Sequence, residues 1–351
     1  MRIVALAART LRWPIAGRGA ARGRTERAAV IVELRGARGE VGLGEAAPLP
    51  GMSRETIDDA ERAIAAFAGQ APFDVIDRQA AFAIAGAYAE APSARFAIET
   101  ALLDALARDR GVALAQLLGA PGAPAIAEVP LAAVGDEPDA ARAAVAAGIR
   151  CLKIKLVAGD DVGRVFAIAA AAPGARLRID ANRSWPRAEL AGRLAALAAL
   201  PIDYVEEPCQ GTHQLLDAAL PCKLALDESL GALTADELAA ALRGPALAAL
   251  ILKPTLLGGF AVSLALADRA RRAGIAAIAS HGLEGPVGTA ACAELALALG
   301  GPHAAGLAAH AALAGWRLAP PQLAADRVHA APAPGLGLPA LDLAGLRRSL
   351  R

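Results

Sequence analysis

Short apolar runs alternate with helix-compatible segments along the chain beyond residue 124. The runs are rich in Val, Ile and Leu, whereas the intervening segments combine Ala, Leu and Arg. Strands that alternate with helices are typical of βα units and a parallel sheet. The eight predicted strands are Val129–Val134, Cys151–Leu156, Leu177–Asp180, Tyr204–Glu207, Leu224–Asp227, Leu250–Lys253, Ala276–Ser280 and Ala305–Ala309. Eight units within about 190 residues favour a closed (β/α)8 barrel over an open doubly wound sheet. No G-x-G-x-x-G motif follows any of these runs, which disfavours a dinucleotide-binding fold.

The first 120 residues have a different pattern, which predicts a small α+β unit. The expected strands are Val30–Leu34 and Val41–Leu43, and the expected helices are Arg54–Ala68 and Ala94–Arg108. Ser53 and Ser93 are expected to cap these helices. A Pro/Gly-rich segment at residues 120–124 predicts a boundary. We therefore expect an α+β unit over residues 1–120, a barrel over 121–320, and a tail over 321–351 that packs back on the first unit.

Composition narrows the class of protein. The chain has 351 residues, with 36 Lys and Arg against 35 Asp and Glu. It therefore has no excess of positive charge that would indicate binding to nucleic acid or to an anionic membrane. Hydrophobic residues make up 56%, which excludes global disorder. The longest uncharged stretch, residues 295–316, contains Gly-Gly-Pro and two histidines, so we do not expect it to cross a membrane. The four cysteines form no C-x-x-C pair and are expected to be reduced, buried thiols of a cytoplasmic protein.

Three of the predicted strands end in a carboxylate: Asp180, Glu206 and Asp227. The C-terminal strand ends of a (β/α) barrel surround one mouth, so these residues are expected to converge. Like charges that lie close together raise each other's pKa unless a cation lies between them. Three oxygen ligands with room for water and substrate suit Mg²⁺, with Mn²⁺ as a possible substitute.

Lysines are expected at the same mouth. Lys153 and Lys155 lie two residues apart on one strand, so they share a face, while Lys253 ends a strand on the opposite side. An amine that faces a metal-bound carboxylate can remove the proton α to it. The usual lysine pKa of about 10.4 must fall to about 7–8 for this task, and we expect Lys153 and the metal to lower the pKa of Lys155.

Six ordered segments resemble the enolase superfamily, in its muconate-lactonizing-enzyme-like subgroup and, within it, the o-succinylbenzoate synthases. The segments are KIK (153–155), LRIDANRSW (177–185), VEEPC (205–209), LALDESL (224–230), ILKPTLLGG (251–259) and SHGLEGPVG (280–288). GEAAPLPGMSRET (44–56) is similar to that family's capping domain. The resemblance implies a modified (β/α)8 TIM-type barrel with an α+β capping domain formed by the N-terminal segment and the C-terminal tail.

The resemblance also implies an activity, the Mg²⁺-dependent syn-dehydration of 2-succinyl-6-hydroxy-2,4-cyclohexadiene-1-carboxylate to o-succinylbenzoate in menaquinone biosynthesis. It assigns Lys155 as the base that leads to an enediolate, Lys253 as the cation opposite, and Lys153 as the helper beside the base. The implied metal ligands are Asp180, Glu206 and Asp227. A small dicarboxylate is the expected partner.

Further residues receive supporting roles. Arg178 is expected near the substrate carboxylate, and Asn182 is expected to orient the site. Because adjacent strand residues face opposite ways, Glu207 and Glu228 are expected to lie behind the acids that precede them. The turn formed by Gly282, Leu283 and Glu284, together with Ser280, is expected to offer backbone N–H groups to the succinyl carboxylate. His281 departs from the small residues expected in that segment, and its role stays open: pocket wall, hydrogen-bond donor or bystander.

Other interpretations stay open. The Arg-rich segment Trp13–Arg27 is either a surface loop or a lid that closes over the mouth. The same lysines and metal would also serve an N-succinylamino acid racemase or a dipeptide epimerase, although Ser280-His281-Gly282 has no acidic pair for a dipeptide's ammonium. A Schiff-base aldolase would not need three carboxylates, and a non-catalytic barrel would not need the lysines.

Overall fold

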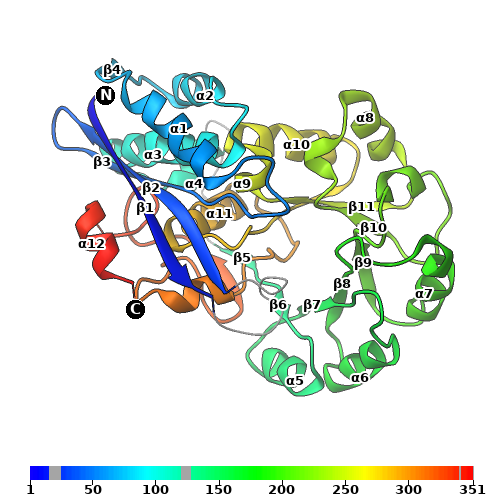
Figure 1. Cartoon of the computed structure of the whole chain (residues 1–351). Helices are drawn as coiled ribbons and strands as arrows, with labels where there is room; N and C mark the ends of the chain where they lie inside the picture. The colour runs from blue at the N-terminus through cyan, green and yellow to red at the C-terminus, as the bar shows by residue number, and fades with distance from the viewer. Residues whose placement is uncertain (16–24, 120–127, 340, 351) are drawn as a thin grey trace.

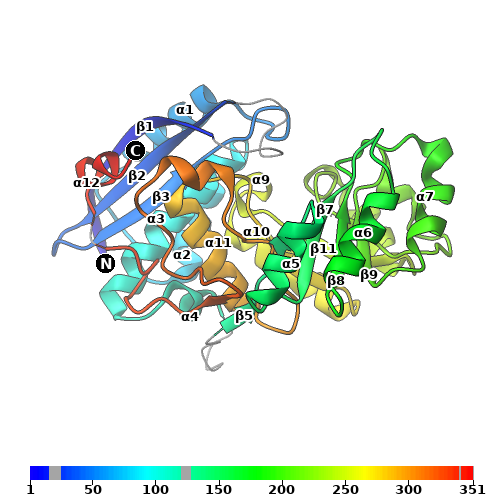
Figure 2. The same ribbon diagram turned by 90° about the horizontal axis from the view of Figure 1, so that it is seen from below.

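The computed structural model describes residues 1–15, 25–119, 128–339 and 341–350. Two units lie side by side (Figure 1). One is an antiparallel sheet covered by helices, and the other is a curled parallel sheet surrounded by helices. Figure 2 shows the same two units from below. The predicted class, a modified TIM-type barrel with an N-terminal capping domain, is confirmed.

The capping unit is built on a four-stranded sheet in the order β3-β2-β1-β4. The strands are β1 (Arg2–Pro14), β2 (Glu26–Gly36), β3 (Val41–Ala46) and β4 (Phe73–Asp74), and the helices are α1 (Ile57–Ala68), α2 (Arg78–Gly86), α3 (Pro92–Arg110) and α4 (Leu114–Leu118). Helix α3 packs directly on β3 because Gly42 and Gly44 have no side chains. A Cβ at either glycine would lie 2.0 Å from an α3 carbonyl oxygen, of Ala101 and Ala97 respectively.

Both predicted helix caps are wrong. Thr56 caps α1, and its side chain and that of Asp59 form a reciprocal capping box. Helix α3 begins at Pro92, since proline at the first turn loses no helical hydrogen bond. Ser93 therefore lies inside the helix, where its backbone N–H donates to Glu55 Oε1 at 2.7 Å.

The parallel sheet has the strand order β12-β11-β10-β9-β8-β7-β6, and every adjacent pair is parallel. Its strands are β6 (Ala133–Val134), β7 (Cys151–Lys155), β8 (Arg176–Asp180), β9 (Ile202–Glu206), β10 (Leu224–Leu226), β11 (Leu247–Leu252) and β12 (Ala276–Ala279). The surrounding helices are α5 (Pro138–Ala146), α6 (Gly163–Ala171), α7 (Leu190–Leu197), α8 (Ala235–Arg243), α9 (Pro254–Leu257), α10 (Phe260–Arg272) and α11 (Pro286–Leu299). Short 3-10 helices are η1 (Arg187–Glu189), η2 (Thr212–Leu215), η3 (Leu230–Ala232) and η4 (Ala311–Gly315).

The predicted eighth strand at residues 305–309 does not form. Instead, Ala305 bridges to Leu131 and Gly306 bridges to Ser280, so two residues close the gap between β6 and β12. The first predicted strand, Val129–Val134, is also divided. Residues Glu128–Pro130 form β5, which pairs antiparallel with β13 (Arg327–His329), and only the remainder enters the barrel as β6.

The C-terminal segment returns to the capping sheet. Helix α12 (Leu343–Arg348) lies beside β1 and β2 in Figure 1, and the backbone N–H of Leu343 donates to Glu33 Oε2 at 2.7 Å. All four cysteines are buried and unpaired, as predicted. Within the described ranges, no helix combines the length and apolar character needed to traverse a bilayer.

Candidate active site

The three predicted acids converge at one end of the parallel sheet. Asp180 and Glu206 are the last residues of β8 and β9 and are paired in register, while Asp227 directly follows β10. All three are buried, at 3%, 1% and 5% exposure. Lys153 Nζ lies 2.9 Å from both Asp180 Oδ2 and Glu206 Oε2. The strand-end pattern therefore predicted a real cluster.

The lysines reach this cluster from different strands. Lys153 and Lys155 belong to β7, and Lys155 stands opposite Asp180 in the β7–β8 register. Lys253 follows β11, is buried, and forms an ion pair with Asp227. Because β8, β9 and β10 lie between β7 and β11, Lys155 and Lys253 approach the mouth from well-separated parts of the wall.

Backbone contacts fix the position of Lys155. Its N–H donates to Asp136 Oδ1 at 2.8 Å, and its carbonyl accepts a hydrogen bond from the guanidinium of Arg164. That guanidinium also donates to the carbonyl of Asp136 at 2.6 Å. These hydrogen bonds connect the end of β7 to the loop that follows β6, and they restrict movement of the Lys155 backbone.

Burial and charge together set the protonation states. Burial raises the pKa of Glu206 to about 8, and repulsion from Asp180 and Asp227 acts in the same direction. Burial also raises the pKa of Asp227. Burial alone would lower the pKa of Lys153, but the carboxylates of Asp180 and Glu206 outweigh it and raise that pKa well above its usual value. Lys153 is therefore an ammonium ion whose charge offsets part of the acidic cluster.

The acidic cluster has the chemistry of a divalent-cation site. Asp180 and Asp227 lie close enough to Glu206 for their charges to raise its pKa, an arrangement that a shared proton or a cation stabilises. Buried carboxylate oxygens are the ligands that Mg²⁺ prefers. Among the described residues, no three His, Cys, Asp or Glu side chains enclose a space suited to a metal ion as they stand. The Lys153 ammonium lies between Asp180 and Glu206 instead, so these acids could hold a cation if that ammonium moved aside.

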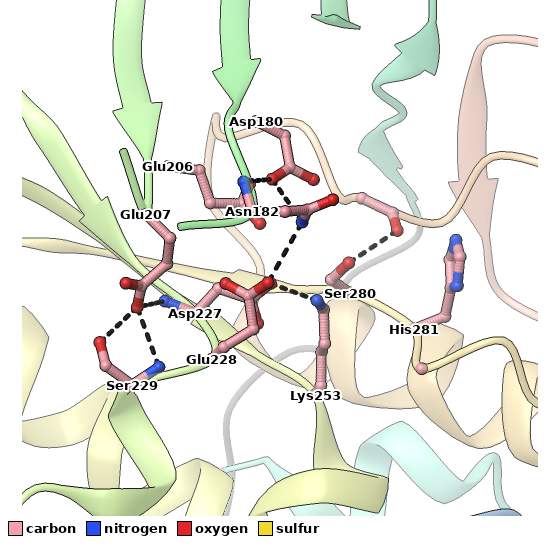
Figure 3. A network of polar contacts seen from close by, with 12 residues as sticks. Asp180, Asn182, Glu206, Glu207, Asp227, Glu228, Ser229, Lys253, Ser280 and His281 are labelled. Carbon is pink, nitrogen blue, oxygen red and sulfur yellow. Dashed lines mark hydrogen bonds and ion pairs between the residues drawn. The ribbon is translucent and has the colours of Figure 1, made fainter. Parts of the chain in front are cut away.

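Asn182 and Glu207 support the acids from the turns after β8 and β9 (Figure 3). Asn182 Nδ2 donates to Asp180 Oδ1 at 2.8 Å and to Glu228 Oε1 at 3.1 Å. Glu207 Oε1 accepts from the backbone N–H of Asp227 at 3.0 Å and from that of Ser229 at 2.9 Å. Both Asn182 and Glu207 have positive φ values, 46° and 41°, because the chain turns sharply there.

The expectation that Glu228 lies behind Asp227 is wrong. Strand β10 ends at Leu226, so strand alternation does not apply to the next two residues. Asp227 contacts Lys253, while Glu228 accepts from Asn182, and both face the cluster. Burial raises the pKa of Glu228 as well.

Arg178 lies deeper in the barrel than the acids. It is 4% exposed, donates to the carbonyl of Ala304 at 2.7 Å, and its guanidinium carbon lies 5.2 Å from the centre of the Tyr204 ring. Asp203 Oδ2 is 3.5 Å from its Nε. These contacts are structural, and the predicted contact with substrate stays a prediction.

The predicted backbone nest for a substrate carboxylate is already filled by the protein. The N–H of Gly282 donates to both carboxylate oxygens of Glu284, at 2.9 and 2.8 Å. The N–H of Leu283 donates to His281 Nδ1 at 3.2 Å. The nest prediction is therefore corrected: the Glu284 carboxylate takes the place expected for a ligand. Ser280 Oγ donates to the carbonyl of Gly306 at 3.1 Å and helps close the barrel wall.

Two capping-unit residues that were not predicted from the sequence hold this loop. Arg27 is 1% exposed, and its guanidinium donates to the carbonyls of Leu283 at 2.8 Å and Gly282 at 3.3 Å. Glu45 accepts from the N–H of Gly285 and, at 2.8 Å, from that of Gly288. These partners lie more than 230 residues away in sequence, so local patterns contain no signal for them.

The predicted lid segment is only partly described. Residues 16–24 lie outside the described residues. Trp13 is buried, donates to the carbonyl of Ala312 at 2.7 Å and packs edge-on against Trp316 with ring centres 5.2 Å apart. Because Trp13 and Arg27 are both fixed in the body of the protein, the predicted bounds of the lid were too wide.

Comparison with known proteins agrees with this architecture. Residues 3–119 match the mandelate racemase / muconate lactonizing enzyme N-terminal domain, and residues 136–342 match the enolase C-terminal domain-like family. The o-succinylbenzoate synthase of Pectobacterium atrosepticum is 31% identical over 268 residues, which cover 73% of this chain and 74% of that protein.

Solved structures give the same result. A dipeptide epimerase from Methylococcus capsulatus, complexed with Mg and the dipeptide L-Arg-D-Lys, has 29% identity and a TM-score of 0.81, covering 96% of this chain and 99% of the other. The muconate lactonizing enzyme of Pseudomonas putida has 25% identity and a TM-score of 0.82 over 99% of both chains.

The capped barrel, with lysines on opposite sides of its mouth and buried acids between them, defines the class of protein. The chain belongs to the enolase superfamily of enzymes, in its muconate-lactonizing-enzyme-like subgroup.

Proposed function

We propose that this protein is an o-succinylbenzoate synthase. The observation that carries the proposal is the convergence of Lys155, Lys253 and three buried acids from separate strands at one mouth. The 31% identity to the Pectobacterium synthase supports the choice of substrate, a cyclohexadiene dicarboxylate.

In this proposal, Lys155 removes the proton α to the ring carboxylate. The C–H electron pair first delocalises into the ring carboxylate as an enediolate and then forms the new ring double bond as hydroxide leaves from the same face, and the Lys155 ammonium gives its proton to the leaving hydroxide to form water. Lys253 stays protonated, because its partner Asp227 helps raise its pKa against the effect of burial. Its ammonium would stabilise negative charge that develops on the ring from the opposite side.

Asp180, Glu206 and Asp227 would hold a Mg²⁺ ion in the active enzyme. Once bound, Mg²⁺ would make the α-proton more acidic by drawing charge from the substrate carboxylate. Asn182 and Glu207 would keep the first and last of these acids in place through the hydrogen bonds described above. The ammonium of Lys153, which lies between Asp180 and Glu206, would move aside to make room for the metal ion.

A second candidate is racemisation of an N-succinylamino acid. It is favoured by the placement of Lys155 and Lys253 on opposite parts of the wall, which allows one lysine to remove the α-proton and the other to return one. The 29% identity to a dipeptide epimerase points to the same class of proton transfer. A dipeptide itself is disfavoured, because Ser280-His281-Gly282 has no acidic pair for its ammonium group.

The test is a spectrophotometric assay with 2-succinyl-6-hydroxy-2,4-cyclohexadiene-1-carboxylate, run with Mg²⁺ and with EDTA. We expect aromatisation with Mg²⁺ and its loss in EDTA. A parallel assay follows α-proton exchange of an N-succinylamino acid in D₂O. Exchange without dehydration would replace the first candidate by the second, and full activity in EDTA with borohydride trapping would reject both in favour of Schiff-base chemistry.

A further inference from the structure

Helix α9 is a short turn that connects Lys253 to the start of α10. Lys253 is the N-cap of α9, and its carbonyl accepts the N–H of Leu257 at 3.0 Å. The carbonyl of Pro254 accepts the N–H of Gly259 at 2.8 Å. The backbone from Lys253 to Gly259 is therefore closed by its own hydrogen bonds, and a displacement of Gly259 would be passed on to Lys253.

The far end of this turn is held by the capping unit. Glu99 lies within α3, is fully buried, and accepts the N–H of Ala261 at 3.2 Å and that of Phe260. Phe260 and Ala261 begin α10, whose N-cap, Gly259, has no side chain that could accept their N–H groups. A carboxylate from the other unit of the molecule therefore takes the place of a local cap.

The contact between α3 and this turn leaves little room for adjustment. Gly259 has a φ of 107°, and a Cβ there would lie 2.0 Å from Glu99 Oε2. The rings of Phe96 and Phe260 meet edge-on, with their centres 5.3 Å apart. Close-packed groups of this kind transmit a displacement, so the position of α3 determines the position of the turn.

Glu99 is costly to bury without partners. Burial raises the pKa of Glu99 to about 7, although the two N–H bonds and the charge of Arg95 act in the opposite direction. A buried acid depends on such hydrogen bonds. Glu99 and the first turn of α10 therefore stabilise one another in a single arrangement.

The two opposed lysines of the mouth are positioned by different parts of the molecule. Lys253 extends from this turn to Asp227, with which it forms an ion pair (Figure 3). The backbone of Lys155 is held by Asp136 and Arg164, which both belong to the barrel. The hydrogen bonds that Glu99 makes in the described part of the chain are with the segment that continues from Lys253, so a change at Glu99 should move one lysine and leave the other in place.

We propose that Glu99 is a positioning residue, which fixes the place of Lys253 at the mouth of the barrel from across the boundary with the capping unit. The inference rests on the proposed function for the chemical role of Lys253, but not for its position. It gives the capping unit a part in the placement of a reacting group.

The test uses a spectroscopic signal for each lysine, so that it does not depend on turnover. The chain has only four lysines, Lys153, Lys155, Lys223 and Lys253. Protein labelled with ¹³C at the lysine Cε gives four NMR signals, which Lys→Arg substitutions assign. In Glu99→Gln, which keeps the size of the side chain but only one acceptor oxygen, we expect the Lys253 signal to shift by more than its linewidth. Those of Lys155 and the exposed Lys223 should not move.

Two more variants and a kinetic measurement complete the design. Glu99→Leu has no acceptor and should enlarge the shift of Lys253. Glu294→Gln is the matched control, because Glu294 is equally buried and accepts the N–H of Ala115 at 2.7 Å across the same boundary, at α4. It should leave the Lys253 signal in place. For dehydration, Glu99→Gln should lower kcat about tenfold to a hundredfold with KM changed less than twofold, as misplacement of a reacting group predicts.

The outcomes separate this inference from the proposed function. An unmoved Lys253 signal in Glu99→Gln would overturn the inference, as would the same shift of Lys253 in Glu294→Gln. An equal shift of the Lys155 signal would also overturn it, because it would indicate a general change in the barrel. If the Lys253 signal moves as expected but the wild type does not dehydrate the cyclohexadiene substrate, the proposed function alone is rejected.

Discussion

Glu45 offers the sharpest test of how the capping unit is attached to the barrel. It is fully buried on β3 and accepts N–H bonds from Gly285 and Gly288 at the start of α11. Burial raises the pKa of Glu45 from 4.5 to about 7, even though these two bonds favour the charged form. A folded-state pKa above the unfolded one stabilises the protein fully below pH 4.5, and this contribution is lost as the pH rises through about 7.

The size of the effect follows from the same values. A pKa raised from 4.5 to about 7 corresponds to about 3 kcal/mol of unfolding free energy between the two ends of that window. Glu45→Gln removes the ionisation and should therefore remove this pH dependence. Relative to the wild type, the variant should gain about 2.5 kcal/mol in unfolding free energy between pH 5 and pH 8, because pH 5 already lies within the window.

Urea unfolding at the two pH values measures this difference. Tryptophan fluorescence is a suitable signal, because Trp13 and Trp316 are buried and packed together between the capping sheet and the C-terminal segment. Glu90→Gln, at an exposed residue, is the control and should show the same pH dependence as the wild type. A free-energy difference between Glu45→Gln and wild type that does not change with pH would refute the reasoning, because it would mean that the two N–H bonds fully offset the effect of burial.

Three predictions concern the proposed chemistry. Lys155→Ala should abolish dehydration with an unchanged circular dichroism spectrum, and retained turnover would reject the base assignment. Asp227→Asn should weaken Mg²⁺ binding at least tenfold, about 1.4 kcal/mol, as measured by calorimetry, and an unchanged titration would count against this ligand. Lys153→Met leaves Asp180 and Glu206 without their cation, so without Mg²⁺ we expect it to be destabilised by about 3 to 5 kcal/mol. Saturating Mg²⁺ should reduce that loss, and an equal loss in both conditions would show that the ammonium and the metal do not share a place.

The sequence predicted the middle of the barrel well because its strands end in charged residues. The run CLKIKL became β7 over Cys151–Lys155, and Asp180 and Glu206 are the final residues of β8 and β9. These short strands combine Leu, Ile or Val with a charged last residue that marks a clear end, so pattern and structure coincide. Strand β1 was missed because only Ile3, Leu11 and Trp13 are buried along its thirteen residues and exposed apolar residues lie between them, which gives a weak two-residue period.

The predictions failed for residues that lie just beyond the end of a strand and for residues whose roles depend on tertiary contacts. Alternation assigned Glu228 to the far side of the wall, but β10 had already ended two residues earlier. The backbone donors at Gly282 and Leu283 were expected to be open to a ligand, but neighbouring side chains use them. Arg27 and Glu45 could not be predicted, because their roles depend on partners in the other unit of the molecule.

The short closure of the barrel gives its wall a seam between β12 and β6. Within the described ranges, four hydrogen bonds cross it at Ala305 and Gly306, two from each side. His281 lies on one side of this seam, directly after Ser280, and His310 follows the segment that closes the seam. The lysines and acids, in contrast, stand at the ends of strands joined by continuous ladders. A shift at this seam would move the two histidine rings before it disturbed the strand ends that carry the lysines and acids.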